Sequence, residues 1–360
     1  MSNKISVYII DDSAVVRQTV TAMLEYSPEI CVTKVFSNPV LAQPSVLAEP
    51  PDVIILDIEM PQMDGITFLR WLMGNKPIPV IICSSLTTTG AQLSVEALSL
   101  GAFEILTKPE CGLKSFLESQ REQFIKVVKQ ARFYRPKSST EDISRAPAIN
   151  VAMSNTNLAI NTTDKVVAIG TSTGGTQALE YIFSQLEPEL PGIVVVQHMP
   201  ANFTKAFAQR LNDLSKLKIK EAEHNERVLA NHVYIAPGSH HLQLVRRGAF
   251  YYTQLKDGPP VQRHKPSVNV LFQSVAKQVR SNAIGFILTG MGADGAFGLL
   301  EMKKSGAKTY AQDESSSVVF GMPKEAIKLN AHSKEVSLTD VPMTITQFFC
   351  FGKRNSCLRD

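Results

Sequence analysis

Short apolar runs alternate with amphipathic stretches over the first 130 residues. The apolar runs have the length of β-strands and lie at 5–10, 32–36, 53–56, 80–83 and 105–106. The amphipathic stretches have the spacing of helices and lie at 14–24, 66–73, 94–100 and 117–133. Strands and helices that alternate at these intervals form parallel sheets covered on both faces. The pattern therefore predicts a doubly wound (βα)5 domain over residues 1–130.

A second doubly wound α/β domain is predicted over residues 164–350, after a linker at 131–163. The linker is rich in Ser, Thr, Asn and Ala and lacks strong periodicity. Beyond it, strands are expected at 166–169, 193–197 and 284–289, with helices at 176–186 and 295–304. Three β-rich runs at 233–236, 242–245 and 250–253 predict a β-hairpin insertion. The tail at 351–360 receives no assignment.

Composition and charge narrow the class of protein. Hydrophobic residues make up 44% and charged residues 19% of the 360 residues, which is typical of a globular chain. No apolar run approaches about 20 residues, so we expect no membrane insertion. Residues 1–134 hold 11 basic and 14 acidic side chains, whereas residues 164–360 hold 23 basic and 17 acidic ones. Because the basic residues are dispersed, we do not expect nucleic-acid binding. Five scattered cysteines and the lack of a signal peptide favour a reduced, cytoplasmic setting.

Acidic and polar residues stand at the strand ends of the first predicted domain. They are Asp11, Asp12, Asp57, Ser84 and Lys108. Ligands of doubly wound sheets gather at this edge, and three converging carboxylates favour a divalent cation such as Mg²⁺. The Asp57 carboxylate can form an acyl phosphate, with Ser84 and Lys108 in contact with the phosphoryl oxygens. Any single aspartate could instead cap a helix, so the interpretation depends on the complete set.

A serine, a histidine and an aspartate stand at strand ends in the second predicted domain. The turn at 170–174 satisfies G-x-S-x-G around Ser172, and His198 and Asp294 follow two further buried runs. These residues can act as nucleophile, general base and orienting carboxylate in acyl transfer. The candidates for the oxyanion hole are the backbone amides of Thr173 and Met291. The glycine-rich turn alone could equally cradle a phosphate, and the histidine or aspartate alone would more often be structural.

The first domain resembles the receiver domain of two-component response regulators. The resemblance covers about residues 1–128 and rests on IDDS at 10–13, LDIEMPQMDG at 56–65 and TKP at 107–109. It implies that Asp57 is the phosphoacceptor and that Asp12, beside Asp11, is a metal ligand. It also implies that the backbone carbonyl of Glu59 contributes a further ligand to Mg²⁺. Ser84 stands where the family has Thr or Ser.

The second domain resembles the catalytic domain of the chemotaxis protein-glutamate methylesterases. The resemblance covers about residues 165–345 and rests on five segments. They are IGTSTGG at 169–175, QHMP at 197–200, VYIAPG at 233–238, LTGMGADG at 288–295 and VVFGMPKEA at 318–326. It implies hydrolysis of glutamate methyl esters and deamidation of selected glutamines through an acyl-enzyme on Ser172, with no cofactor in this domain. One departure is Asn269, where we expect the family to carry Asp.

The two resemblances together imply a regulated enzyme of receptor adaptation. The expected substrates are methyl-accepting chemotaxis receptors, and the expected phosphodonor is a histidine kinase of the chemotaxis type. In the family the unphosphorylated receiver covers the catalytic cleft, and phosphorylation at Asp57 relieves the block. We expect the protein to be a monomer. The alternative is a response regulator whose output domain only binds a partner or nucleic acid, which leaves Ser172, His198 and Asp294 without a role.

Overall fold

The computed structural model describes residues 4–85, 87–109, 114–136 and 165–354. Most of the predicted linker at 131–163 and the last six residues of the predicted tail lie outside these ranges. The described chain divides into two compact units, one of residues 4–83, 100–109 and 114–136 and one of residues 84–85, 87–99 and 165–354. In the described ranges, each helix is too short or too polar to cross a bilayer.

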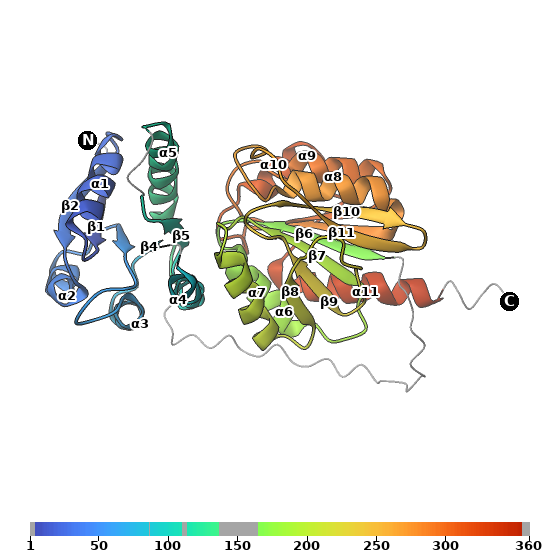
Figure 1. The fold of residues 1–360 in the computed structure, drawn as a ribbon, viewed down its shortest axis with the longest axis horizontal. Helices are drawn as coiled ribbons and strands as arrows, with labels where there is room; N and C mark the ends of the chain where they lie inside the picture. The colour runs from blue at the N-terminus through green and yellow to red at the C-terminus, as the bar shows by residue number, and fades with distance from the viewer. Residues whose placement is uncertain (1–3, 86, 110–113, 137–164, 355–360) are drawn as a thin grey trace. The chain divides into compact units, whose positions relative to one another are not determined.

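The N-terminal part of the chain forms the predicted five-stranded parallel sheet (Figure 1). Its strands are β1 (Ile5–Ile10), β2 (Ile30–Phe36), β3 (Val53–Leu56), β4 (Val80–Ser84) and β5 (Glu104–Thr107). Its helices are α1 (Ala14–Glu25), α2 (Pro39–Ala48), α3 (Gly65–Asn75), α4 (Thr88–Ser99) and α5 (Lys114–Ala131). The strand order is β2-β1-β3-β4-β5, so the chain adds β2 on one side of β1 and β3 to β5 on the other, with the switch point between β1 and β3. Ligands bind beside such a switch point, at the carboxyl ends of the strands.

The C-terminal part contains a seven-stranded parallel sheet and a separate hairpin (Figure 1). The sheet strands are β6 (Val166–Thr171), β7 (Gly192–Gln197), β8 (Lys218–Glu221), β9 (His232–Ile235), β12 (Ala283–Ile287), β13 (Lys308–Gln312) and β14 (Lys334–Val336). The hairpin strands are β10 (His241–Arg247) and β11 (Phe250–Lys256). The strand order is β14-β13-β12-β6-β7-β9-β8, so the chain reverses direction at β6.

Helices cover both faces of the seven-stranded sheet. They are α6 (Gly175–Gln185), α7 (Phe203–Leu214), α8 (Val268–Gln278), α9 (Ala296–Lys304), α10 (Met322–Lys328) and α11 (Val341–Arg354), with short 3₁₀ turns at Arg280–Asn282 and Leu338–Asp340. Figure 1 shows α8 and α9 on one side of the sheet and α6, α7 and α11 on the other. Every residue of β6 and β7 is buried, as expected for central strands of a covered parallel sheet. The predicted doubly wound α/β class is confirmed for both parts.

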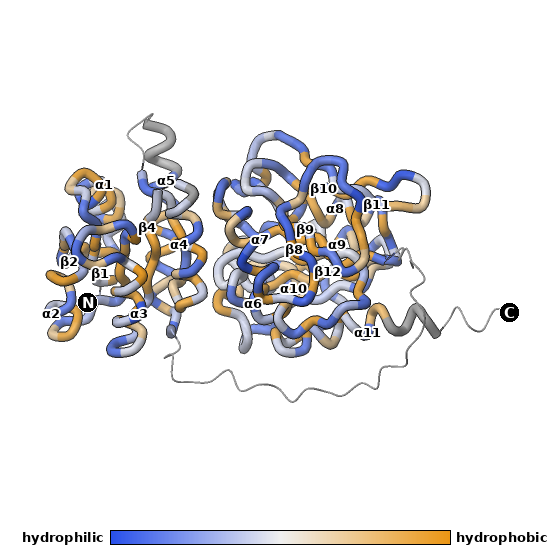
Figure 2. The backbone as a smooth tube through the Cα atoms, turned by 60° about the horizontal axis from the view of Figure 1, so that its bottom comes forward, coloured by the Kyte–Doolittle hydropathy of each residue, from blue (hydrophilic) through white to orange (hydrophobic). Residues whose placement is uncertain are grey.

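The hydrophobic residues lie where two-sided burial requires them. Figure 2 shows a hydrophobic stretch along the inner strand β4, whereas hydrophilic and hydrophobic residues alternate along the covering helices. All five residues of β4 are buried. The run is continuously apolar because both faces of the sheet are covered, and its length is that of a strand rather than a helix.

The predicted hairpin insertion is partly wrong. The runs at 242–245 and 250–253 do pair as β10 and β11, and the turn Arg247–Phe250 joins them. The run at 233–236, however, belongs to β9, which pairs in parallel with β7 and β8 in the main sheet. A short apolar run does not reveal its pairing partner, and here tertiary contacts decide it.

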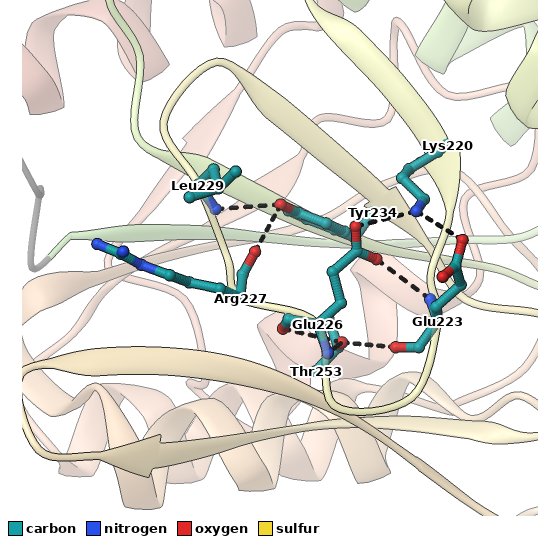
Figure 3. A network of polar contacts seen from close by, with 7 residues as sticks. All are labelled: Lys220, Glu223, Glu226, Arg227, Leu229, Tyr234 and Thr253. Carbon is teal, nitrogen blue, oxygen red and sulfur yellow. Dashed lines mark hydrogen bonds and ion pairs between the residues drawn. The ribbon is translucent and has the colours of Figure 1, made fainter. Parts of the chain in front are cut away.

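A polar network ties the hairpin to the edge of the main sheet (Figure 3). The hydroxyl of Tyr234 in β9 donates to the carbonyl of Arg227 at 2.9 Å and accepts from the amide of Leu229 at 3.1 Å. The hydroxyl of Thr253 in β11 donates to the carbonyl of Glu223 at 2.6 Å. Lys220 in β8 pairs with the carboxylate of Glu223 at 2.7 Å and that of Glu226 at 2.9 Å. These bonds satisfy the backbone of an irregular segment that would otherwise bury unpaired polar groups.

Candidate active site

Ser172 lies in a tight turn between the central strand β6 and helix α6. Gly174 has φ +77°, and a Cβ there would lie 2.5 Å from the Cβ of Val318, so this position requires glycine. A Cβ on Gly175 would lie 2.2 Å from Oγ1 of Thr171. The carbonyl of Thr289 accepts the Ser172 amide at 3.0 Å and the Thr171 hydroxyl at 2.8 Å. The turn is therefore held against the end of the neighbouring strand β12.

His198 directly follows β7, which neighbours β6 on the side opposite β12. Its amide donates to the carbonyl of Thr171 at 3.1 Å, which brings it to the same sheet edge as Ser172. Its Nε2 lies 2.8 Å from Oδ2 of Asp294, and its side chain is 8% exposed. Its Nδ1 is buried and has no hydrogen-bond partner among the described residues. With the Nε2 proton directed to Asp294, Nδ1 is left as the proton acceptor of the neutral ring.

Asp294 lies after β12, against the N-terminus of helix α8. Oδ2 accepts the amide of Val268 at 2.7 Å, and Oδ1 accepts the amide of Asn269 at 3.1 Å. The Ser267 hydroxyl donates to Oδ1 at 2.8 Å. Burial raises the pKa of Asp294, but the hydrogen bond and charge of His198 and the bonds from Ser267 and Asn269 outweigh burial, so the pKa is lowered overall. The carboxylate is thus ionised and fixed in orientation by α8.

Thr173 and Met291, the candidates for the oxyanion hole, flank Ser172. Thr173 is buried, and its carbonyl accepts the Thr289 hydroxyl at 2.9 Å. A Cβ on Gly290, the neighbour of Met291, would lie 2.8 Å from Cβ of Ser172. The segment carrying Met291 therefore passes directly beside the serine.

Several residues that shape this site were not assigned a role there from the sequence. Ser267 caps α8 and binds Asp294 with the same hydroxyl. Its position before an apolar run indicates a helix start, but nothing local indicates the contact across 27 residues. Gln197 donates from Nε2 to the carbonyls of Ser172 and His198, at 2.9 and 3.1 Å. Asn269, the departure noted above, is structural, because its Oδ1 accepts the Gly298 amide at 2.7 Å and so joins α8 to α9.

A second site lies at the carboxyl edge of the N-terminal sheet. Asp11 follows β1 and Asp57 follows β3, on the two strands at the switch point. Lys108, which follows β5, places Nζ 3.1 Å from Oδ2 of Asp11 and 2.7 Å from Oδ2 of Asp57. Burial raises the pKa of Asp57 to about 6 although Lys108 opposes the shift. Burial likewise raises the pKa of Asp11.

The three aspartates of this edge fit a divalent cation. Asp11, Asp12 and Asp57 each offer a carboxylate oxygen, and these oxygens lie within 4.8 Å of one another. One lysine cannot balance three carboxylates, and Mg²⁺ prefers oxygen ligands of this kind. Ser84 is buried at the end of β4, where its hydroxyl donates to the carbonyl of Ser85 at 3.3 Å. Glu59 lies two residues after Asp57 in the loop that follows β3, and its side chain is exposed.

These features fit a response regulator that consists of a receiver and an α/β output domain, in which a histidine–aspartate pair and a serine follow adjacent strands of one sheet. The response regulator receiver family matches residues 7–117, and the CheB methylesterase family matches residues 167–345. The chain belongs to the CheB methylesterase family.

Relatives share both parts of the chain. The protein-glutamate methylesterase/protein-glutamine glutaminase 2 of Pseudomonas syringae is 50% identical over 352 residues, which are 95% of this chain and 98% of that protein. A protein-glutamate methylesterase/protein-glutamine glutaminase 3 of Shewanella oneidensis is 51% identical over 352 residues, with 96% and 99% coverage. The crystal structure of the Thermotoga maritima CheB methylesterase catalytic domain is similar with a TM-score of 0.50 and 38% identity, and covers 51% of this chain and 97% of that one.

Proposed function

We propose that this chain is a phosphorylation-regulated protein-glutamate methylesterase and protein-glutamine deamidase. The names of relatives that are about 50% identical over nearly the whole chain support this activity. The proposed substrates are glutamate methyl esters and selected glutamines on methyl-accepting chemotaxis receptors, whose demethylation resets receptor signalling. Residues 164–350 form the catalytic domain, which the linker at 131–163 joins to the receiver at 1–130.

Ser172 is the proposed nucleophile and His198 the proposed general base. Nδ1 of His198 accepts the hydroxyl proton as Oγ of Ser172 attacks the ester carbonyl carbon. The imidazolium then returns the proton to the leaving oxygen, the ester C–O bond breaks, and methanol departs. Water hydrolyses the acyl-enzyme by the same proton transfers in reverse order and regenerates the serine. For a glutamine substrate the C–N bond breaks instead, and ammonia leaves.

Asp294 and the backbone complete the proposed mechanism. The ionised carboxylate holds the Nε2 proton of His198 and stabilises the imidazolium that forms during attack. The amides of Thr173 and Met291 are the proposed donors to the developing oxyanion. The observation that carries the proposal is the 2.8 Å contact of His198 with Asp294 combined with a buried, unpartnered Nδ1 among the described residues.

In the receiver, Asp57 is the proposed phosphoacceptor and a histidine kinase the proposed donor. Asp11, Asp12 and Asp57, with the backbone carbonyl of Glu59, would hold Mg²⁺, which neutralises charge on the incoming phosphoryl group when bound. Ser84 and Lys108 would contact the phosphoryl oxygens after transfer.

Methanol release from methylated receptor membranes tests the proposed activity. We expect Ser172→Ala to lower kcat at least about 1000-fold, because the nucleophile is lost. The matched control is Ser184→Ala, which removes an exposed hydroxyl that donates to the Tyr181 carbonyl and accepts from the Gln185 side chain, both on the same helix. Full activity in Ser172→Ala would exclude the acyl-enzyme mechanism.

A further inference from the structure

We infer that His264 is a positioning residue that stabilises the protonated ring of His198 during catalysis. The two imidazole rings are stacked, with centroids 3.8 Å apart and planes inclined by 2°. The inference rests on the proposed function, because it assumes that His198 gains a proton in the reaction.

The stack completes the restraint on the His198 ring. The contact of Nε2 with Asp294 fixes one ring atom, but the ring could still tilt about that bond. A parallel neighbour at van der Waals distance blocks the tilt on one face. Nδ1 is then held in a single direction, which general base catalysis requires.

The loop that carries His264 is built to present this side chain. Gln262 and Arg263 both have positive φ, 50° and 69°, a conformation that side-chain-bearing residues adopt at a cost in free energy. The amide and carbonyl of Val261 pair with those of His264, both at 3.0 Å, and close this turn. Strain of this kind persists only where surrounding contacts enforce it.

Further contacts anchor the loop on both sides of the turn. The buried ring of His241 contacts the carbonyl of Pro259 through Nε2 at 3.1 Å and accepts the amide of Ser267 on Nδ1 at 3.1 Å. Lys265 pairs with Asp257 at 2.9 Å. Ser267 also donates to Asp294. The same set of hydrogen bonds therefore anchors Asp294 and the loop that carries His264, the two residues that contact the His198 ring.

Stacking favours the transition state over the ground state. Two neutral rings attract each other weakly, whereas an imidazolium above the face of a neutral aromatic ring gains a cation–π attraction. The charge on His198 exists only while Ser172 attacks or the leaving group departs. An interaction made only then raises kcat and leaves KM unchanged.

Three substitutions in the full-length protein separate the aromatic face from simple packing. His264→Phe keeps a flat aromatic ring, His264→Leu keeps apolar volume without one, and His264→Ala removes both. Methanol release is measured at pH 8, above the ordinary titration range of histidine, with acetyl phosphate and Mg²⁺ present. We expect kcat of the Phe variant within about threefold of the parent, kcat of the Leu and Ala variants about tenfold lower, and KM unchanged within about twofold.

Two controls keep the test decisive. His224→Leu changes an exposed histidine of the same unit and should keep full kcat. Ser172→Ala must be inactive in the same assay; if it is not, the proposed function fails rather than the role of His264. The inference would be overturned if the Phe and Leu variants had equal kcat, whether both kept the kcat of the parent or both lost it to the same extent.

A measurement on the parent protein avoids any folding defect of the variants. NMR of histidine-labelled protein measures the chemical shifts of the ring protons, and the His198 signals are those lost in His198→Gln. Because a stacked ring shields the protons above its face, the ring protons of His198 should lie upfield of those of exposed His224. Ring protons of His198 at the shifts of an exposed histidine would show that the stack does not form, and the inference would fail.

Discussion

Asp57 is a buried carboxylate whose ionisation opposes folding. Its pKa is about 6 in the folded chain against an ordinary value of 3.8, because burial outweighs the attraction of Lys108. The destabilisation is absent below about pH 4, where the group is protonated in both states, and is complete above about pH 6. Asparagine imitates the protonated form. We therefore expect Asp57→Asn to increase the free energy of unfolding by about 1–3 kcal/mol at pH 7.5 without metal.

Trp71 allows this prediction to be measured in the intact chain. It is the only tryptophan of the sequence and lies in α3, where it stacks on Phe68, so its fluorescence reports on the receiver part. Urea unfolding at pH 7.5 and at pH 4 should show the gain only at pH 7.5. Glu25→Gln, an exposed change in α1, should stay within about 0.5 kcal/mol of the parent at both pH values. An equal gain for Asp57→Asn at both pH values would show that titration is not the cause.

At the residue scale, strand ends were the informative positions in the sequence. Ser172, His198 and Asp294 could be singled out because each directly follows or lies shortly after a strand, and strand ends share one sheet edge. Ser267 and His264 could not, because neither follows a strand and their contacts cross 27 and 66 residues. Such contacts depend on how α8 and its preceding loop pack, which local pattern does not encode.

At the element scale, the turn after β12 passes close to the turn between β6 and α6 that carries Ser172. We therefore expect that Gly290, which lies at this contact, cannot be replaced without a loss of activity. A methyl group there would lie 2.4 Å from Sδ of Met322 and 2.8 Å from Cβ of Ser172. The sulfur can move aside, but Cβ of Ser172 moves only with the nucleophile turn. We expect Gly290→Ala to lower kcat at least about 10-fold and the stability by about 1–3 kcal/mol.

Gly258→Ala is the matched control for this prediction. It lies in the same unit, and a Cβ there would meet nothing within 4 Å. Methanol release and thermal unfolding of both variants provide the comparison, and the control should keep its kcat. A Gly290→Ala variant with parental kcat would show that the nucleophile turn tolerates displacement.

Strands could be predicted better than helices from this sequence, for a physical reason. The bounds predicted for β1 and β3 agree with the structure, because buried parallel strands are continuous apolar runs. Helix α2 was not predicted. It contains Pro44 and leaves Leu41 and Leu47 exposed, so its residues show no amphipathic stripe. Helix α4 begins at Thr88, six residues before the predicted start, in a Thr-rich segment of weak helix propensity.

At the scale of the whole molecule, the two sites occupy equivalent places in two separate sheets. In the first sheet, Asp11 and Asp57 follow β1 and β3 on either side of the switch point. In the second, the strands that precede Asp294, Ser172 and His198 are the adjacent strands β12, β6 and β7. One architectural rule therefore positions both a phosphoacceptor candidate and a nucleophile candidate.

If phosphorylation of Asp57 regulates the enzyme, acetyl phosphate with Mg²⁺ should raise methanol release by the full-length protein. We expect an increase of at least about fivefold, no increase for Asp57→Asn, and loss of the increase when EDTA removes the Mg²⁺ that Asp11, Asp12 and Asp57 are proposed to bind. Ser172→Ala should stay inactive under every condition, which separates activation from phosphodonor hydrolysis. Phosphorylation without a change in methanol release would show that the receiver does not control this active site. Activation that persists in Asp57→Asn would instead place the phosphoacceptor elsewhere, because asparagine cannot form the acyl phosphate.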